Sequence, residues 1–147
     1  MDAEINLVKL WADEDMLALH VEVSDGKSRF AHDVHVGHLH LKNTLAGLDG
    51  FKDQVYGGIY DLRFGEFGPE FASGAFHARL HFQDKGKLHV TVKAESEYFD
   101  FGKTHIASQA TLYLNAEPAQ LDDFLRELRA LSDGYSDDAR LRALPPQ

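Results

Sequence analysis

The sequence predicts an α+β protein: a twisted antiparallel sheet of about six to seven strands, packed by a C-terminal helix and a short middle helix. Residues 76–83, 88–95 and 105–114 alternate apolar and polar side chains, which is typical of half-buried antiparallel strands. A helical stripe of apolar residues follows, made of Leu121, Phe124, Leu125, Leu128 and Leu131. Because sheet and helix each have one apolar side, we expect them to pack on each other, with the sheet open or rolled into a half-barrel.

The pattern of apolar residues in the N-terminal half predicts a meander of three strands followed by a helix. An apolar-rich segment, 4–11, precedes two segments of alternating residues, 16–23 and 29–36. A helical spacing of leucines then predicts a helix from His38 to Leu48, which Gly50 would end.

The remaining elements are less regular. Glycines interrupt the segment after the middle helix, and within it only residues 59–64 are typical of a strand. Pro118 suits the first turn of the last helix, where its missing N–H costs nothing. The chain beyond that helix is polar. We therefore expect a single α+β domain over residues 1–134 and a loosely attached C-terminal tail over residues 135–147.

The composition narrows the class of protein. Fifteen Lys and Arg residues against 24 Asp and Glu residues give a formal net charge of −9. This charge disfavours nucleic acid and membranes as partners and favours a basic protein, although an acidic balance can also serve solubility alone. The absence of cysteine excludes disulfides and thiolate metal sites. The chain shows no signal-peptide pattern and no apolar run of the ~20 residues that span a bilayer, so we expect a soluble cytoplasmic protein.

No sequence motif predicts an enzyme. Phosphate-binding glycine loops, zinc-protease motifs and nucleophile elbows are absent from the sequence. Among the nine histidines, His32 and His35 point to opposite faces of a strand, whereas His81 and His89 face each other across a predicted hairpin, close to the positive charge of Arg79. We therefore expect no catalysis, no cofactor and no metal, and we interpret the histidines as solvated strand residues.

One strand connection gathers acidic and aromatic residues. Its members are the predicted partner-binding residues Glu95, Glu97, Tyr98, Asp100 and Phe101. Protein interfaces favour aromatic anchors, and carboxylates suit a basic partner. Glu95 and Glu97 are two residues apart and share one strand face, which we expect to be exposed. In the alternative interpretation, the aromatic residues belong to the core and the acids are only solvated.

The order of elements and the closing helix Leu-Asp-Asp-Phe-Leu-Arg-Glu-Leu resemble small bacterial proteins of unknown function, the WapI-type families grouped with polymorphic-toxin immunity proteins. The matching pattern is Leu-x-x-Phe-x-x-x-Leu at Leu121, Phe124 and Leu128, within an outline that covers most of residues 5–131. The resemblance transfers no functional residue. It implies a non-enzymatic cytoplasmic inhibitor that binds a cognate toxin.

Two functional hypotheses follow from the sequence. The first is a protein-binding module, an immunity or antitoxin-like inhibitor that masks a basic partner with an acidic surface. The alternative is a small-ligand-binding domain that uses a cavity between the curved sheet and the helix. The sequence does not predict an oligomeric state.

Overall fold

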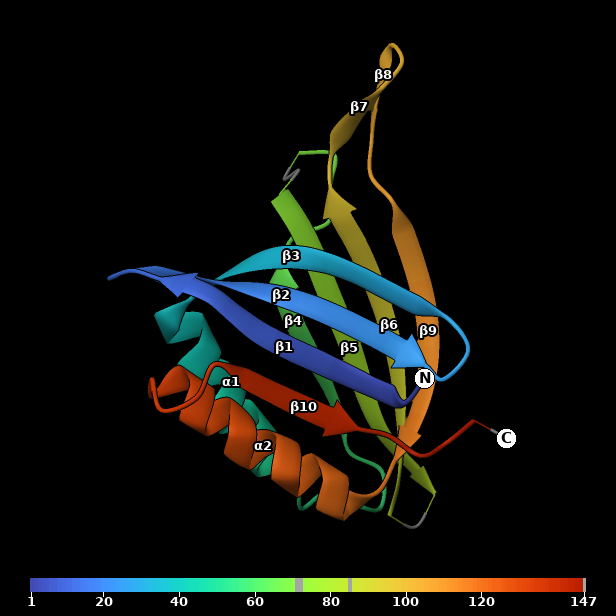
Figure 1. The fold of residues 1–147 in the computed structure, drawn as a ribbon. Coiled ribbons are helices and arrows are strands. Elements are labelled where there is room, and N and C mark those ends of the chain that lie inside the picture. The colour runs from blue at the N-terminus through green and yellow to red at the C-terminus, as the bar shows by residue number, and fades with distance from the viewer. Residues whose placement is uncertain (71–72, 85, 147) are drawn as a thin grey trace.

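The computed structural model describes residues 1–70, 73–84 and 86–146, without the side chain of Asp84. Within these residues, ten strands form two four-stranded antiparallel sheets and a two-stranded hairpin, and there are two helices. The two large sheets lie face to face with their strands crossing, and both helices lie together beside them (Figure 1). The predicted α+β class, the antiparallel pairing and both helices are confirmed.

The first sheet has the strand order β10-β1-β2-β3 and contains the predicted N-terminal meander. Its strands are β1 (Ala3–Ala12), β2 (Met16–Asp25), β3 (Arg29–Gly37) and β10 (Asp138–Arg142). Strand β1 pairs with β2 on one side and with β10 on the other, so the two ends of the chain meet in this sheet.

The second sheet has the strand order β4-β5-β6-β9. Its strands are β4 (Ile59–Gly65), β5 (Ser73–Asp84), β6 (Lys87–Glu97) and β9 (Gln109–Ala116). The register places His81 opposite His89 and Phe82 opposite Leu88, which confirms the predicted hairpin pairing. Between β6 and β9 the chain makes the separate hairpin of β7 (Phe99–Phe101) and β8 (Thr104–Ile106).

The helices are α1 (His38–Phe51) and α2 (Pro118–Ser132). Helix α2 packs mainly on β10 and also contacts α1, which in turn contacts β3 and β4. Pro118 begins α2, and Gly134 follows its end with a φ of 84°, a left-handed conformation that favours glycine. Neither described helix has the length and apolarity that a membrane span requires.

The core fills the space between the sheets and continues beneath the helices. All five members of the predicted α2 stripe are buried. Phe51 of α1 stacks on Phe82 of β5, with 5.0 Å between the ring centroids. Strand β3 lies across β4, β5 and β6, so the apolar faces of the two sheets cover each other. The strands therefore form two layers and not the predicted single sheet. Periodicity cannot reveal this difference, because it shows which face of a strand is buried but not which strands pair with each other.

Residues 135–146, the described part of the predicted tail 135–147, are not loosely attached as their polarity predicted. Residues 138–142 form β10, in which Ala139 and Leu141 are buried. On the outside, Nη1 of Arg142 binds Oε2 of Glu127 from α2 at 2.8 Å. Two buried positions are too few to produce a recognisable strand pattern, so this strand is not evident from the sequence.

His32 is not solvated, in contrast to the prediction for the histidines. It lies on the inner face of β3 between the rings of Phe30 and Phe76. Its Nε2–H donates a hydrogen bond to the backbone oxygen of Ala75 at 2.9 Å, which links β3 to β5. Burial lowers the pKa of His32, so the ring is neutral near pH 7.

We expect the variant Leu141→Ala to lower the free energy of unfolding by about 2–4 kcal/mol, because it opens a cavity between β10 and α2. Denaturant unfolding measures this change. Tyr135→Ala, at an exposed position just before β10, is the control and should change the value by less than about 0.5 kcal/mol. Equal, small effects would mean that β10 contributes little to the folded state.

We also expect His32 to make the protein less stable in mild acid. Because burial lowers its pKa in the folded state, the unfolded chain takes up the proton first. The contribution of His32 is fully present above about pH 6.5 and is lost as the pH falls from there toward the folded pKa. Denaturant unfolding of the wild type and of His32→Gln at pH 7.5 and below about pH 6 measures the effect, and the variant should lose less stability on acidification.

His20 provides a control of opposite sign for this measurement. Its hydrogen bond to Asp33 raises its pKa, so its contribution is present below about pH 6.5 and is lost as the pH rises through the raised pKa. His20→Gln should therefore increase the loss of stability in acid. If His32→Gln behaved in the same way, a buried neutral imidazole would not be the cause.

Candidate functional site

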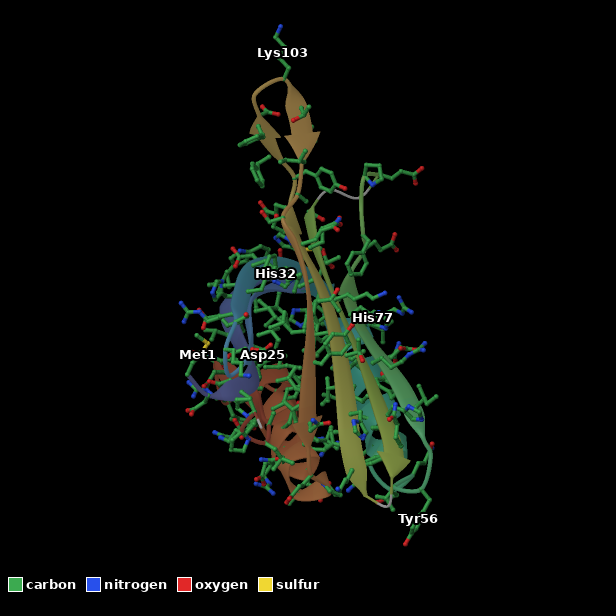
Figure 2. The ribbon with its side chains drawn as sticks, turned by 90° about the vertical axis from the view of Figure 1, so that its right-hand side faces the viewer. Met1, Asp25, His32, Tyr56, His77 and Lys103 are labelled. Carbon is green, nitrogen blue, oxygen red and sulfur yellow. The ribbon has the colours of Figure 1, made fainter. Side chains whose placement is uncertain are left out.

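The β7–β8 hairpin projects from one end of the second sheet, where β6 leads into it and β9 leads out. We call residues 97–108 the arm. Figures 1 and 2 show it extending away from both sheets, with Lys103 at its tip. All six residues of β7 and β8 are exposed, so the arm is not covered by the described remainder of the chain.

One face of the arm is apolar. Phe99 pairs with Ile106 and Phe101 with Thr104, so these four side chains share a face. Phe99, Phe101 and Ile106 have exposed fractions of 43%, 68% and 38%. A contiguous apolar face that remains in contact with water marks an interaction site more often than isolated surface residues do.

The opposite face of the arm is polar. Asp100 and His105 are paired in the register, and Nδ1 of His105 lies 3.1 Å from Oδ1 of Asp100. The ring of His105 also lies 5.5 Å from the ring of Tyr98, measured between centroids. These contacts fix which face of the arm presents the aromatic residues.

The base of the arm is held by a buried carboxylate, Glu95. Its Oε2 accepts a hydrogen bond from the N–H of Gly68 at 2.7 Å, and its Oε1 accepts one from Nε2 of Gln109 at 2.8 Å. The Tyr98 hydroxyl donates a longer bond to Oε1 at 3.4 Å. Glu95 is only 2% exposed, so the prediction that it shares an exposed face with Glu97 is wrong. The loop around Gly68 folds over this end of the strand, which period-two alternation cannot anticipate.

The ring of Tyr98 packs closely against Gly68. A Cβ at position 68 would overlap the ring atoms of Tyr98, so the close approach requires glycine. Partial burial and the negative charge of Glu95 raise the pKa of Tyr98, so the phenol remains protonated and donates to the carboxylate. The loop, β6 and β9 are thus connected to one another where the arm begins.

The arm and its base are acidic. Glu97 and Asp100 on the arm are exposed, as are Glu66 and Glu70 on either side of Gly68. Lys103 is the basic residue at the tip. The apolar face of the arm is therefore accompanied by negative charge, which favours a positively charged partner.

The structure places the predicted partner-binding residues on the arm and at its base, with Phe101 on the apolar face and Asp100 on the opposite face. Glu97, Asp100 and Phe101 are exposed and Tyr98 is half-buried, whereas Glu95 has a supporting position beneath them. Sequence reasoning missed Phe99 and Ile106 as surface residues. Phe99 lies two residues before Phe101, but alternation does not show which of two faces is covered, and Ile106 joins this face only through its pairing with Phe99 across the hairpin.

A second exposed apolar group lies where β1 ends and β2 and α1 begin. It was not anticipated from the sequence, and its members are Leu10, Trp11, Met16 and Leu39. The ring of Trp11 lies 5.7 Å from the ring of His35, so β3 partly covers this one side chain.

The outer face of the second sheet differs from the rest of this acidic protein. Arg63, His77, Arg79 and Lys93 lie on it, with the carboxylate of Asp61 among them. Arg79 binds Asp61 through Nε at 2.9 Å and Nη2 at 3.2 Å, and His77 binds it at 2.8 Å. The Arg79 hydrogen bond lowers the pKa of Asp61 to about 2, so the carboxylate remains ionised and offsets one positive charge.

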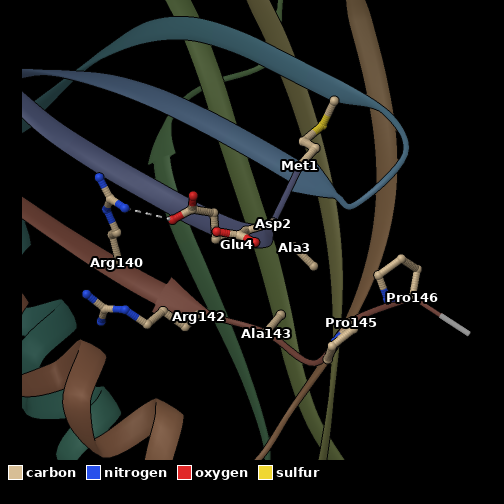
Figure 3. A pocket seen from close by; sticks show the side chains of 9 residues that line it. All are labelled: Met1, Asp2, Ala3, Glu4, Arg140, Arg142, Ala143, Pro145 and Pro146. Atoms are coloured by element: carbon tan, nitrogen blue, oxygen red, sulfur yellow. Dashed lines mark ion pairs between the residues drawn. The ribbon is translucent and has the colours of Figure 1, made fainter.

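In the described part of the chain, no three His, Asp or Glu side chains come together as metal ligands. A hollow of about 220 Å³ lies beside the N-terminus, lined by Glu4 and the end of β10 among others (Figure 3). Its two arginines are already bound to carboxylates, Arg140 to Glu4 at 3.6 Å and Arg142 to Glu127, which leaves little free charge for a ligand.

We expect Glu95→Gln to loosen the base of the arm, because an amide cannot accept hydrogen bonds at both terminal atoms. The free energy of unfolding should fall by about 1–3 kcal/mol, and the amide hydrogen of Gly68 should exchange faster. Denaturant unfolding and hydrogen exchange measure the two effects. Glu97→Gln, two residues away and exposed, should change neither. An unchanged exchange rate at Gly68 in Glu95→Gln would show that the carboxylate does not anchor the loop.

Comparison with protein-family models, curated proteins and solved structures gives no significant match to this chain. The resemblance to immunity-type proteins therefore remains a prediction from the sequence pattern, and the function has to be inferred from the residues of the chain itself.

Proposed function

We propose that this chain is a non-enzymatic protein-binding module whose contact surface is the arm. The observation that supports the proposal is the exposed apolar face of Phe99, Phe101 and Ile106 on a hairpin that projects from the sheets. Aromatic anchors of this kind supply a large share of the energy at protein interfaces. The hydrogen bonds of Glu95 reduce the ordering cost of binding, because they hold the base of the arm before the partner arrives.

The charges around the arm support a basic partner. The exposed carboxylates Glu66, Glu70, Glu97 and Asp100 accompany the apolar face, and the chain as a whole carries a net charge of −9. Attraction between surfaces of opposite charge accelerates association and suppresses binding to acidic proteins. In its specific form, the proposal is a cytoplasmic inhibitor of the immunity or antitoxin type that masks a basic surface of its target.

The packing of the interior favours this proposal over the small-ligand alternative. Beneath the helices, Phe51 stacks on Phe82, and the apolar side chains of α2 are buried among those of the sheets. A ligand in this space would have to displace core side chains, which costs more than opening a preformed cavity.

Co-expression with the protein encoded beside this chain tests the proposal. If that protein is a toxin, the wild-type chain should restore growth and bind it directly. Phe101→Ala should weaken the measured affinity by about 10- to 100-fold, which corresponds to about 1.4–2.8 kcal/mol. Tyr56→Ala is the matched control: it removes an exposed aromatic ring at the other end of the molecule and should have no effect (Figure 2).

The acidic residues should affect the same interaction differently. The double variant Glu97→Gln/Asp100→Asn should slow association several-fold and reduce its salt dependence, because long-range attraction acts mainly on the on-rate. Surface plasmon resonance at two ionic strengths separates the two rates. Association rates that are equal for the wild type and the double variant would contradict the charge-based part of the proposal, and full affinity in Phe101→Ala would contradict the arm as the contact surface.

A further inference from the structure

The two large sheets have four edge strands, and one of them differs from the others. Strand β10 carries Asp138, Arg140 and Arg142 and packs against α2. Strand β4 has charged residues and a backbone oxygen, that of Arg63, bound by Nε2 of His40 at 2.6 Å. Strand β3 carries Arg29 and Asp33. Charged side chains and covering elements are the means by which edge strands avoid pairing with other chains.

Strand β9, the remaining edge, lacks charge along its whole length. Its sequence, Gln-Ala-Thr-Leu-Tyr-Leu-Asn-Ala, contains no charged residue and no proline. Among residues 1–70, 73–84 and 86–146, β6 is the only strand hydrogen-bonded to it, although β2 also contacts it. The exposed side chains along it are Gln109, Thr111, Tyr113 and Asn115.

One contact reveals which backbone groups of β9 point away from the sheet. The N–H of Leu144 donates to the backbone oxygen of Asn115 at 2.7 Å, from the side opposite β6. Backbone groups of alternate residues point the same way in an antiparallel strand, so those of Thr111 and Tyr113 also face outward. Within the residues that the structure describes, the C-terminal segment covers only the Asn115 end, which leaves the middle of β9 as a row of free donors and acceptors.

We propose that β9 pairs antiparallel with β9 of a second copy of this chain. A twofold axis at Leu112 would set Thr111 opposite the partner's Tyr113 and Tyr113 opposite the partner's Thr111. Both residues in each pair have outward backbone groups, so two rings of paired N–H···O hydrogen bonds form. An aromatic residue opposite a β-branched one is a favourable cross-strand pair, and here it occurs twice.

The absence of charge along β9 makes it the edge at which a second copy can approach despite the net charge of the chain. Each chain carries a net charge of −9, so two copies repel each other through most of their surfaces. Pairing of β9 with β9 places no charged residue of one copy opposite a charged residue of the other. Pairing through β3 would bring charged residues of both copies together. Pairing would join the second sheets into one of eight strands. It requires Leu144 to release the backbone oxygen of Asn115, because the partner's Gln109 would lie beside that residue.

Sedimentation and hydrogen exchange test this proposal without reference to the partner of the arm. The wild type should change from monomer to dimer as its concentration rises to about 1 mM, a range that reveals even a weak dimer. The amides of Thr111 and Tyr113 should become more protected over the same range. A monomer at every concentration, or a dimer without this protection, would overturn the proposal and leave the edge to a strand of another protein.

Thr111→Lys is the diagnostic variant, because two lysines would meet beside the twofold axis. It should weaken dimerisation at least 10-fold. Ala31→Lys is the matched control: it adds the same charge at an exposed position of edge strand β3 and should leave dimerisation unchanged. Circular dichroism and thermal unfolding establish that both variants fold. Equal dimerisation of Thr111→Lys and the wild type would also overturn the proposal.

Discussion

The two large sheets hold together because each has one apolar face and the two faces cover each other. This burial is the main stabilising contribution to the fold, and it determines where the helices lie. Helix α2 covers β10 and α1 lies beside β3 and β4, so the helices close a side that the sheets leave open. The arm extends beyond this arrangement, which explains why its apolar residues are exposed to water.

An exposed hairpin of this size would not keep a fixed direction by itself, since two strands alone are marginally stable in water. Glu95 provides the missing constraint. A buried carboxylate is costly unless hydrogen bonds satisfy it, and here backbone, amide and hydroxyl donors from three segments do so. The same interactions that compensate the burial of Glu95 also orient the arm. Of the carboxylates in this region, Glu95 therefore has a structural role, whereas the others, such as Glu97 and Asp100, are exposed.

The sequence predicted the local structure more fully than the arrangement of the layers. Periodicity located the strands of the meander, the hairpin that pairs His81 with His89, and both helices, because these features depend on neighbours close in the chain. The division into two sheets and the pairing of β10 with β1 depend on contacts between distant residues, and no local pattern encodes them. At the candidate site, the predicted contact residues Phe101 and Asp100 are exposed, which the sequence had left open for the aromatic residue. Glu95 was not correctly placed, because the loop that buries it lies 27 residues away in the sequence.

The pairing of β1 with β10 has a consequence for the way the chain folds during synthesis. Strand β1 finds one of its two neighbours, β10, only after the other strands of both large sheets have been translated. Until then the meander can form, but the backbone groups on one edge of β1 have no strand to pair with. Helix α2 also lacks β10, the strand on which it mainly packs. Contacts of such long sequence separation slow folding, so nascent chains should depend on chaperones until these residues have been translated.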